Sequence, residues 1–259
     1  MHIFFAEWRK LRRPTLLVGS LLAVGAVTAF VTAILFLLID APSGNADRGT
    51  VITRQALALP EGITVGFSSA GSLLGLVALC VFAAQTAQEY SFGTLRNLLV
   101  RQPKRIKLLV GKYIAMITFI AIAIAVSLLA TVVTAYLLAG NAGVSSSAWS
   151  STEALKAMAN SYGNVFIAAL GYGTIGMALG IILRSPISAI SIGVGWLLVV
   201  ENILAAAWKA AINWLPGQLL ALISNGGENY STALLRIGVF LALLLLAIGY
   251  LFSRRDVAN

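Results

Sequence analysis

Long apolar segments alternate with short polar connections along the chain, and the length of the apolar segments is its most informative feature. A helix rises about 1.5 Å per residue, so about 20 apolar residues cross a hydrocarbon core about 30 Å thick. Six segments reach that length, at residues 16–39, 63–87, 108–139, 158–183, 187–208 and 231–252. The pattern predicts an all-α membrane protein of six transmembrane helices, forming one domain over residues 1–259.

The composition agrees with a membrane protein and argues against most enzymes. Of the 259 residues, 59% are hydrophobic and 10% are charged, whereas about a quarter are charged in a soluble domain. The only cysteine, Cys80, allows no intrachain disulfide or cysteine-based metal site, and the only histidine, His2, is terminal. We expect no metal, no catalytic residue and no cofactor in this chain. A membrane-embedded enzyme is a weaker alternative.

The basic residues are divided unequally between the two sides of the predicted membrane. Because Lys and Arg are in excess on the cytoplasmic side, the richer side is predicted to be cytoplasmic, with both termini inside. The net charge of +9 then reflects topology, and no nucleic-acid partner is expected. The inner side holds Arg9, Lys10, Arg12, Arg13, Arg96, Arg101, Lys104, Arg105, Lys107, Lys112, Arg184, Arg254 and Arg255, and the outer side holds Arg48, Arg54, Lys156, Lys209 and Arg236.

Residues 1–14 have the pattern of an amphipathic helix. Phe4, Trp8 and Leu11 recur on one helical face, and charged residues occupy the remainder. The pattern predicts an interfacial anchor with Trp8 at headgroup depth, followed by a bend at Pro14. The alternative is a plain basic anchor that only fixes topology.

The predicted outer connections are polar, except for the last one. Residues 40–62 and 140–157 are rich in Gly, Ser, Asn and Asp and are expected to be solvated. Residues 210–230 contain an apolar piece, 218–223, that is too short to span a membrane. We expect a re-entrant outer hairpin between spans five and six, turning at Pro216 and Gly217.

Residues 88–107 form the one long basic interruption between two spans. Phe92, Leu95 and Leu98 share one face of a predicted helix, while Arg96 and Arg101 lie on another. Gly93 and Thr94 supply a start or a kink, and Pro103 ends the helix. The segment therefore predicts a short amphipathic helix at the cytoplasmic surface. The alternative is a basic loop that only fixes topology.

The same segment carries a family resemblance. Glu89-x3-Gly93-Thr94-Leu95, then Pro103-x-Arg105 and Gly111-Lys112, resembles the signature of ABC-2 type permeases, the membrane subunits of bacterial ABC exporters. The basic N-terminal helix, the six spans and the Pro-containing outer hairpin are similar to the same family. The resemblance covers nearly the whole chain, and it implies a multi-pass protein of the bacterial cytoplasmic (inner) membrane.

The resemblance implies that residues 88–107 form a coupling helix that docks on an ATP-binding subunit. Two copies of that subunit, with their ATP and Mg, would assemble with this chain and a second permease chain, identical or related, in membrane lipid. The matching coupling residues, with Arg96 and Arg101 added on charge alone, are Glu89, Gly93, Thr94, Leu95, Arg96, Arg101, Pro103, Arg105 and Lys112.

The glycine motifs elsewhere in the chain indicate helix packing and not nucleotide binding. No G-x-x-x-x-G-K-S/T sequence exists, so the chain cannot be its own ATPase by that route. The G-x-G-x-x-G at residues 171–176 lies inside an apolar span and is not a nucleotide motif. Gly71 with Gly75, and Gly176 with Gly180, fit the G-x-x-x-G pattern of close helix packing, within one chain or between two copies.

A substrate path would need polar residues inside the spans. Glu201 lies in the fifth predicted span, where a carboxylate costs roughly 2.5–3.5 kcal/mol. It is a candidate substrate or gate residue, with a structural hydrogen bond, for example to Asn202 or Lys209, as the alternative. Ser68, Ser69 and Gln85 make the second span mildly polar, which suits either a cavity or interhelical hydrogen bonds. The candidate substrate-path residues are Ser68, Ser69, Gln85, Glu201 and Asn202.

The expected function is the permease subunit of an ATP-driven exporter. The aliphatic spans favour a hydrophobic or amphipathic substrate, such as a drug, an antibiotic, a peptide or a lipid-like molecule. The alternatives are a passive carrier or channel, and a sodium-exporting ABC permease.

Overall fold

The computed structural model describes residues 2–39, 53–94, 98, 100, 104–227 and 229–254, and all regular secondary structure in these residues is helical. Among the described residues, six helices are long and apolar enough to cross a membrane, which confirms the all-α class and the six candidate spans and indicates a multi-pass membrane protein. They are α2 (Pro14–Leu37), α5 (Gly71–Ser91), α7 (Arg105–Ala139), α8 (Thr152–Leu183), the composite helix Pro186–Ala207, and α12 (Tyr230–Arg254).

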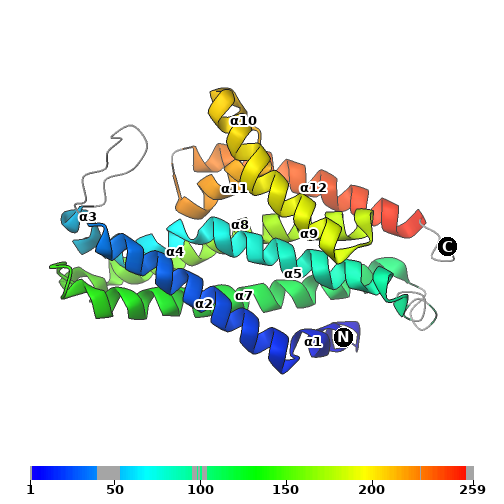
Figure 1. The fold of residues 1–259 in the computed structure, drawn as a ribbon, viewed down its shortest axis with the longest axis horizontal. Coiled ribbons are helices and arrows are strands. Elements are labelled where there is room, and N and C mark those ends of the chain that lie inside the picture. Colours follow the sequence, from blue (N-terminus) through cyan, green and yellow to red (C-terminus); the bar gives the residue numbers. More distant parts are fainter. Residues whose placement is uncertain are drawn as a thin grey trace.

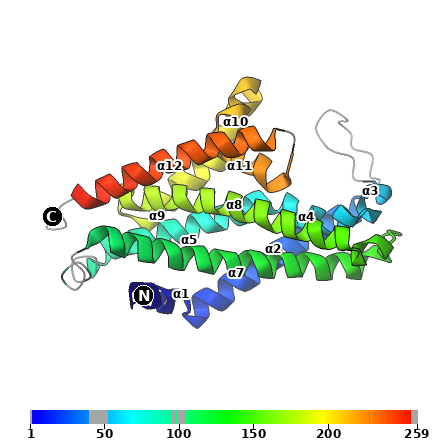
Figure 2. The ribbon, with the colours of Figure 1, turned by 180° about the vertical axis from the view of Figure 1, so that it is seen from behind.

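The helices run mainly along the long axis of the molecule (Figure 1). Helix α5 packs along α8, and α2 packs along α7. Seen from behind, α8 lies between α12 and α7 (Figure 2). Helix α1 (His2–Leu11), the start of α7 and the end of α12 lie at one end of the bundle, which we call the basic end.

Glycines allow α5 and α8 to approach closely. A side chain at Gly176 would overlap the backbone carbonyl of Leu79, and one at Gly75 would overlap the ring of Tyr172. A Cβ at Gly180 would lie 2.9 Å from the carbonyl oxygen of Ala83. Both G-x-x-x-G motifs therefore pack within one chain, which answers a question that the sequence left open.

The second and fourth spans begin elsewhere than predicted. A 3₁₀ turn, η1 (Pro60–Thr64), and the short helix α4 (Val65–Ser69) precede α5, so α5 begins at Gly71. Gly66 lies within α4, and a side chain there would overlap Thr32 of α2, so α4 is held close to α2. Helix α8 begins at Thr152 because the Ser151 hydroxyl accepts a hydrogen bond of 3.2 Å from the Ala154 amide.

The end opposite the basic end is better packed than its polar composition indicated. Trp149, in η2 (Ser147–Ser150), is 2% exposed and donates a 3.0 Å hydrogen bond to the carbonyl of Leu57 in α3 (Arg54–Ala58). Phe36 and Tyr136 meet the Trp149 ring edge-on. The expectation that residues 53–62 and 140–157 are only solvated connections was therefore wrong. Residues 40–52 lie outside the described residues.

The fifth span is a composite of α9 (Pro186–Val194), the π-helical turn η3 (Gly195–Val200) and α10 (Glu201–Ala207). The 3₁₀ turn η4 (Lys209–Asn213) follows, and α11 (Pro216–Asn225) then turns back against α8 and α12. Leu219, Leu220 and Ile223 of α11 are buried. The apolar piece 218–223 thus lies within a short helix that begins at Pro216, where a turn was predicted, and its re-entrant position in a bilayer stays a prediction.

Candidate functional site

Helix α1 lies directly on α7 at the basic end. A side chain at Gly111 would come within 2.6 Å of Ile3, so the two helices touch at that glycine. Phe4 and Trp8 are half-buried against the central core, and Leu11 is 2% exposed within it. The predicted anchor face therefore contacts protein, and Leu11 is not available to lipid.

A closed network of four charges joins α1 to α5 and α7. The ammonium group of Lys112 lies 2.7 Å from Glu7 Oε2 and 2.7 Å from Glu89 Oε1. The ammonium group of Lys10 lies 2.6 Å from Glu7 Oε1 and 2.7 Å from Glu89 Oε1. Lys112 also donates to the Gln85 carbonyl at 3.3 Å. Each carboxylate therefore meets both ammonium groups, and we call these four residues the charge network.

The charge network is largely removed from water. Glu7, Glu89 and Lys112 are 4%, 7% and 3% exposed. Burying one such charge alone would be costly, but two positive and two negative charges at hydrogen-bonding distance compensate one another. Burial alone would raise the pKa of Glu7, yet the charges and hydrogen bonds of Lys112 and Lys10 outweigh burial and hold it below its ordinary value of 4.5.

The stability of the protein should depend on pH through Glu7. Because the folded pKa of Glu7 is depressed, its contribution is complete above pH 4.5 and is lost as the pH falls through the folded pKa. We expect the melting temperature of wild type to fall more steeply below pH 4.5 than that of Glu7→Gln, measured in detergent solution. Parallel acid slopes would contradict this assignment.

At alkaline pH, the stability of the protein should depend on Lys10, with the opposite sign. Burial alone would lower the pKa of Lys10, but Glu89 and Glu7 outweigh burial and raise it above 10.5. The contribution of Lys10 is therefore complete below pH 10.5 and is lost as the pH rises through its folded pKa.

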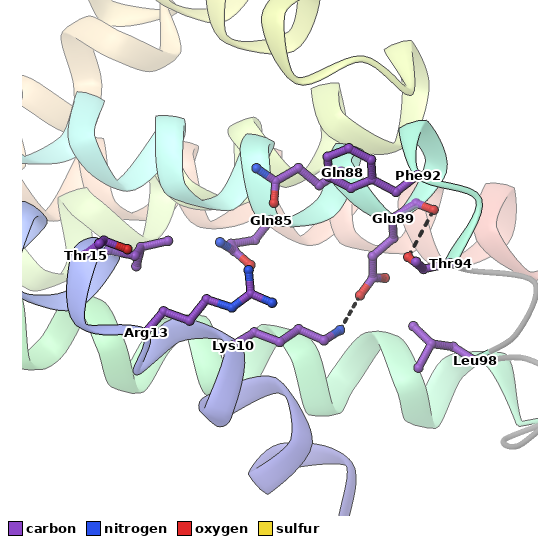
Figure 3. Close-up of a pocket in the computed structure, with 10 residues that line it drawn as sticks. Lys10, Arg13, Thr15, Gln85, Gln88, Glu89, Phe92, Thr94 and Leu98 are labelled. Carbon is purple, nitrogen blue, oxygen red and sulfur yellow. Dashed lines mark hydrogen bonds and ion pairs between the residues drawn. The ribbon is translucent and has the colours of Figure 1, made fainter.

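A cavity of about 540 Å³ opens beside the charge network, between the α1–α2 corner and the end of α5 (Figure 3). Its wall contains two cations, one carboxylate of the network, amides, hydroxyls and a few apolar side chains. The lining residues are Lys10, Arg13, Thr15, Leu16, Gln85, Gln88, Glu89, Phe92, Thr94 and Leu98. The predicted path residue Gln85 and the predicted coupling residues Glu89 and Thr94 thus share one cavity.

Gly93 ends helix α5 at this cavity. Its φ of +64° is the left-handed conformation that glycine adopts without strain, and the Phe92 amide donates to the Gln88 carbonyl at 2.9 Å. The Thr94 hydroxyl donates to the Glu89 carbonyl at 3.5 Å. Gly93 therefore follows the end of α5, where a helix start or a kink was expected.

The structure describes only some of the remaining predicted coupling residues. Leu95, Arg96, Arg101 and Pro103 lie outside the described residues. Arg105 begins α7 and donates to the Ser253 carbonyl at 3.3 Å, which links α7 to α12. Glu89 and Lys112 are buried in the charge network, so their direct contacts in this structure are internal, and their role in coupling stays a prediction.

A second cavity, of about 550 Å³, lies at the opposite end of the bundle and includes Ser68 and Ser69. Asn160, Asn164 and Asn225 also line it. The Ser161 hydroxyl donates to the Thr64 hydroxyl oxygen at 3.1 Å within its wall. Ser68 and Ser69 therefore line a different cavity from Gln85, at the opposite end of the bundle.

Glu201 is held by the start of α11. One carboxylate oxygen accepts from the Gln218 amide at 3.2 Å, and the other accepts from the Trp196 indole at 3.1 Å. Leu215, which precedes α11, has no side-chain acceptor, so Glu201 caps this helix from another part of the chain. Glu201 is fully buried and lines none of the cavities described above, which favours a structural role.

Replacing Glu201 should loosen α11. In Glu201→Ala the Gln218 amide and the Trp196 indole lose their acceptors, and because both hydrogen bonds are only partly buried the cost is about 0.5–1.5 kcal/mol for each. Asn202→Ala is the matched control, because Asn202 is exposed and accepts only a long bond of 3.4 Å from the Gln218 side chain. Limited proteolysis within residues 209–230 measures the difference, and equal protection of the two variants would refute the capping role.

The sequence pattern alone does not single out Glu7 and Lys10 as members of the charge network. The available signal was one acidic residue, Glu7, within a helix that otherwise carries only basic charges, three positions before Lys10. Nothing local indicated the pairing with Lys112, because that contact joins positions 105 residues apart.

Comparisons with known proteins place the chain in a family. A family model described as "Protein of unknown function (DUF2705)" matches residues 30–258. The chain belongs to the DUF2705 family. This family member is 25% identical over 209 residues to the "Uncharacterized protein YhcI" of Bacillus subtilis (strain 168). The match covers 72% of the chain and 66% of the relative, so it spans just under two thirds of the relative's length.

Proposed function

We propose that this chain is the permease subunit of an ATP-driven exporter of the ABC-2 class, located in the bacterial cytoplasmic membrane. The carrying observation is the charge network, which binds the surface helix α1 to the ends of spans α5 and α7. A force applied at the basic end would move these three elements together. The six spanning helices and the resemblance of residues 88–112 to the permease signature support the same proposal.

In the proposed mechanism, the segment that follows Gly93 docks on a separate ATP-binding subunit, and the basic end faces the cytoplasm. Closure of two such subunits on ATP pushes this segment, and the charge network transmits the displacement to α5 and α7. Two permease chains then change from an inward-open to an outward-open population. Hydrolysis in the partner subunits resets the assembly.

The proposed substrate is hydrophobic or amphipathic. Exposed apolar side chains cover the outer faces of α2, α9–α10 and α12, as expected where helices meet lipid or a second permease chain. Such surfaces suit molecules that enter from the membrane itself.

Gly93→Pro and Gly143→Pro form a matched pair that tests this proposal. Both glycines have positive φ, +64° and +67°, and open space around them, so proline imposes similar local strain. Only Gly93 lies at the basic end. We expect Gly93→Pro to abolish ATP-dependent export from vesicles that contain the ATP-binding partner, and Gly143→Pro to retain it at equal membrane insertion. Export in the absence of ATP would instead favour a passive carrier.

A further inference from the structure

The cavity beside the charge network has one charge that its surroundings do not balance. The two ammonium groups and two carboxylates of the network neutralise each other. Among the described residues, the guanidinium of Arg13 has no hydrogen-bond or ion-pair partner, and it lines the same cavity. Figure 3 shows its side chain extending toward Gln85. In the part of the chain that the structure describes, the cavity wall is therefore net positive, and Arg13 is its unpaired cation.

Neutral donors line the same cavity as this cation. They are the side-chain amides of Gln85 and Gln88 and the hydroxyl of Thr15. A cavity that combines a guanidinium with amide and hydroxyl donors suits a phosphate, because arginine binds two phosphate oxygens at once and amides can bind others. The carboxylate of Glu89 does not oppose such a ligand, since both lysines already neutralise it.

The depth of Arg13 indicates where this phosphate comes from. Arg13 immediately precedes Pro14, the first residue of span α2, and this level corresponds to lipid headgroups. From the cavity residue Thr15, one face of α2 continues through Val18 and Leu22, which are 53% and 68% exposed. Gly19, beside them, has open space around it. An apolar stripe therefore runs from the cavity along the first span.

We propose that the corner between α1 and α2 binds one anionic phospholipid, with its phosphate on Arg13 and its acyl chains along Val18 and Leu22. A soluble phosphate would use the same cation but would gain nothing from the apolar stripe. A zwitterionic lipid would bring an ammonium group to a wall that is already positive. The site depends on the membrane-spanning fold and is independent of the proposed transport function.

Arg12 supplies the matched control for the lipid site. It is the preceding residue, it is also exposed and basic, and it does not line the cavity. Arg12→Gln and Arg13→Gln change the total charge equally, so a non-specific attraction of lipid to basic residues would affect both variants alike. Arg13→Lys retains the charge but cannot form bidentate hydrogen bonds to a phosphate. We expect this variant to bind the anionic lipid with intermediate affinity.

Native mass spectrometry of the full chain in neutral detergent tests the site. Phosphatidylglycerol and phosphatidylcholine with identical acyl chains are titrated separately, and inorganic phosphate is added as a competitor. We expect one tightly retained phosphatidylglycerol, weakened at least about fivefold in Arg13→Gln and less than about twofold in Arg12→Gln. Equal weakening in both variants, equal retention of phosphatidylcholine, or full displacement by millimolar phosphate would each overturn the proposal.

Discussion

Lys112→Met is expected to destabilise the protein by about 3 kcal/mol or more, because removal of one partner leaves buried charge uncompensated. Lys112 is 3% exposed and binds both carboxylates of the charge network at 2.7 Å. Without it, Glu7 and Glu89 share only Lys10, and one buried negative charge has no counterpart. We expect a fall of roughly 10 °C in melting temperature and the release of α1 from α7.

Two comparisons separate loss of the charge network from loss of a lysine. Lys107, on the same helix α7, is exposed and forms no ion pair among the described residues, so Lys107→Met should leave the melting temperature unchanged. The double variant Lys112→Met with Glu89→Gln restores charge balance through Glu7 and Lys10, and should recover part of the lost stability. A double variant that is less stable than Lys112→Met would show that the network does not act as a charge-balanced unit.

Gly176→Leu should destabilise the protein by a similar amount, because it disrupts helix packing. Any side chain at Gly176 overlaps the backbone of Leu79, and a backbone cannot rotate out of the way as a flexible side chain can. Helices α5 and α8 would have to separate, and their interface is the most extensive helix pair in the structure. We expect a loss of about 3 kcal/mol and a reduced yield of monodisperse protein in detergent.

Gly238→Leu is the control for this substitution. Gly238 lies on the exposed face of α12, and nothing lies within 4 Å of a side chain built there. The substitution Gly238→Leu introduces the same residue into a spanning helix without a steric clash. If thermal melting in detergent showed equal losses for Gly176→Leu and Gly238→Leu, the close approach of α5 and α8 would not explain the effect.

The sequence predicted the features of the fold that depend on local pattern. Six apolar segments of sufficient length became six long helices, because the length of an apolar run is set by the membrane thickness. Gly93 was recognised as a break in the helical pattern, and the structure shows that this break is the end of α5, with positive φ at the glycine. Gly176 and Gly180 pack against α5, as their spacing suggests.

The features that the sequence did not predict are contacts between distant residues. Glu7 and Lys112 meet only after α1 has folded onto α7, and their positions have no regular spacing that would indicate this. Glu201 is unusual by its position in an apolar segment. Its partner at the start of α11 is the backbone amide of Gln218, and a backbone group cannot be recognised from the pattern of side chains. The polar neighbours of Trp149 indicate a solvated loop, whereas Trp149 is buried and donates a hydrogen bond to the Leu57 carbonyl.

Site-directed photo-crosslinking tests whether the end of α5 contacts a separate ATP-binding subunit, as the proposed function requires. Phe92, at the end of α5, is 75% exposed, and a photoreactive phenylalanine analogue replaces it without disturbing the core. Leu155, 65% exposed at the start of α8 near the opposite end, receives the same analogue as the control. We expect position 92, and not position 155, to crosslink to an ATP-binding cassette protein in native membranes, with a yield that changes when ATP is added. Crosslinks from position 92 to lipid alone, in membranes that retain transport, would contradict it.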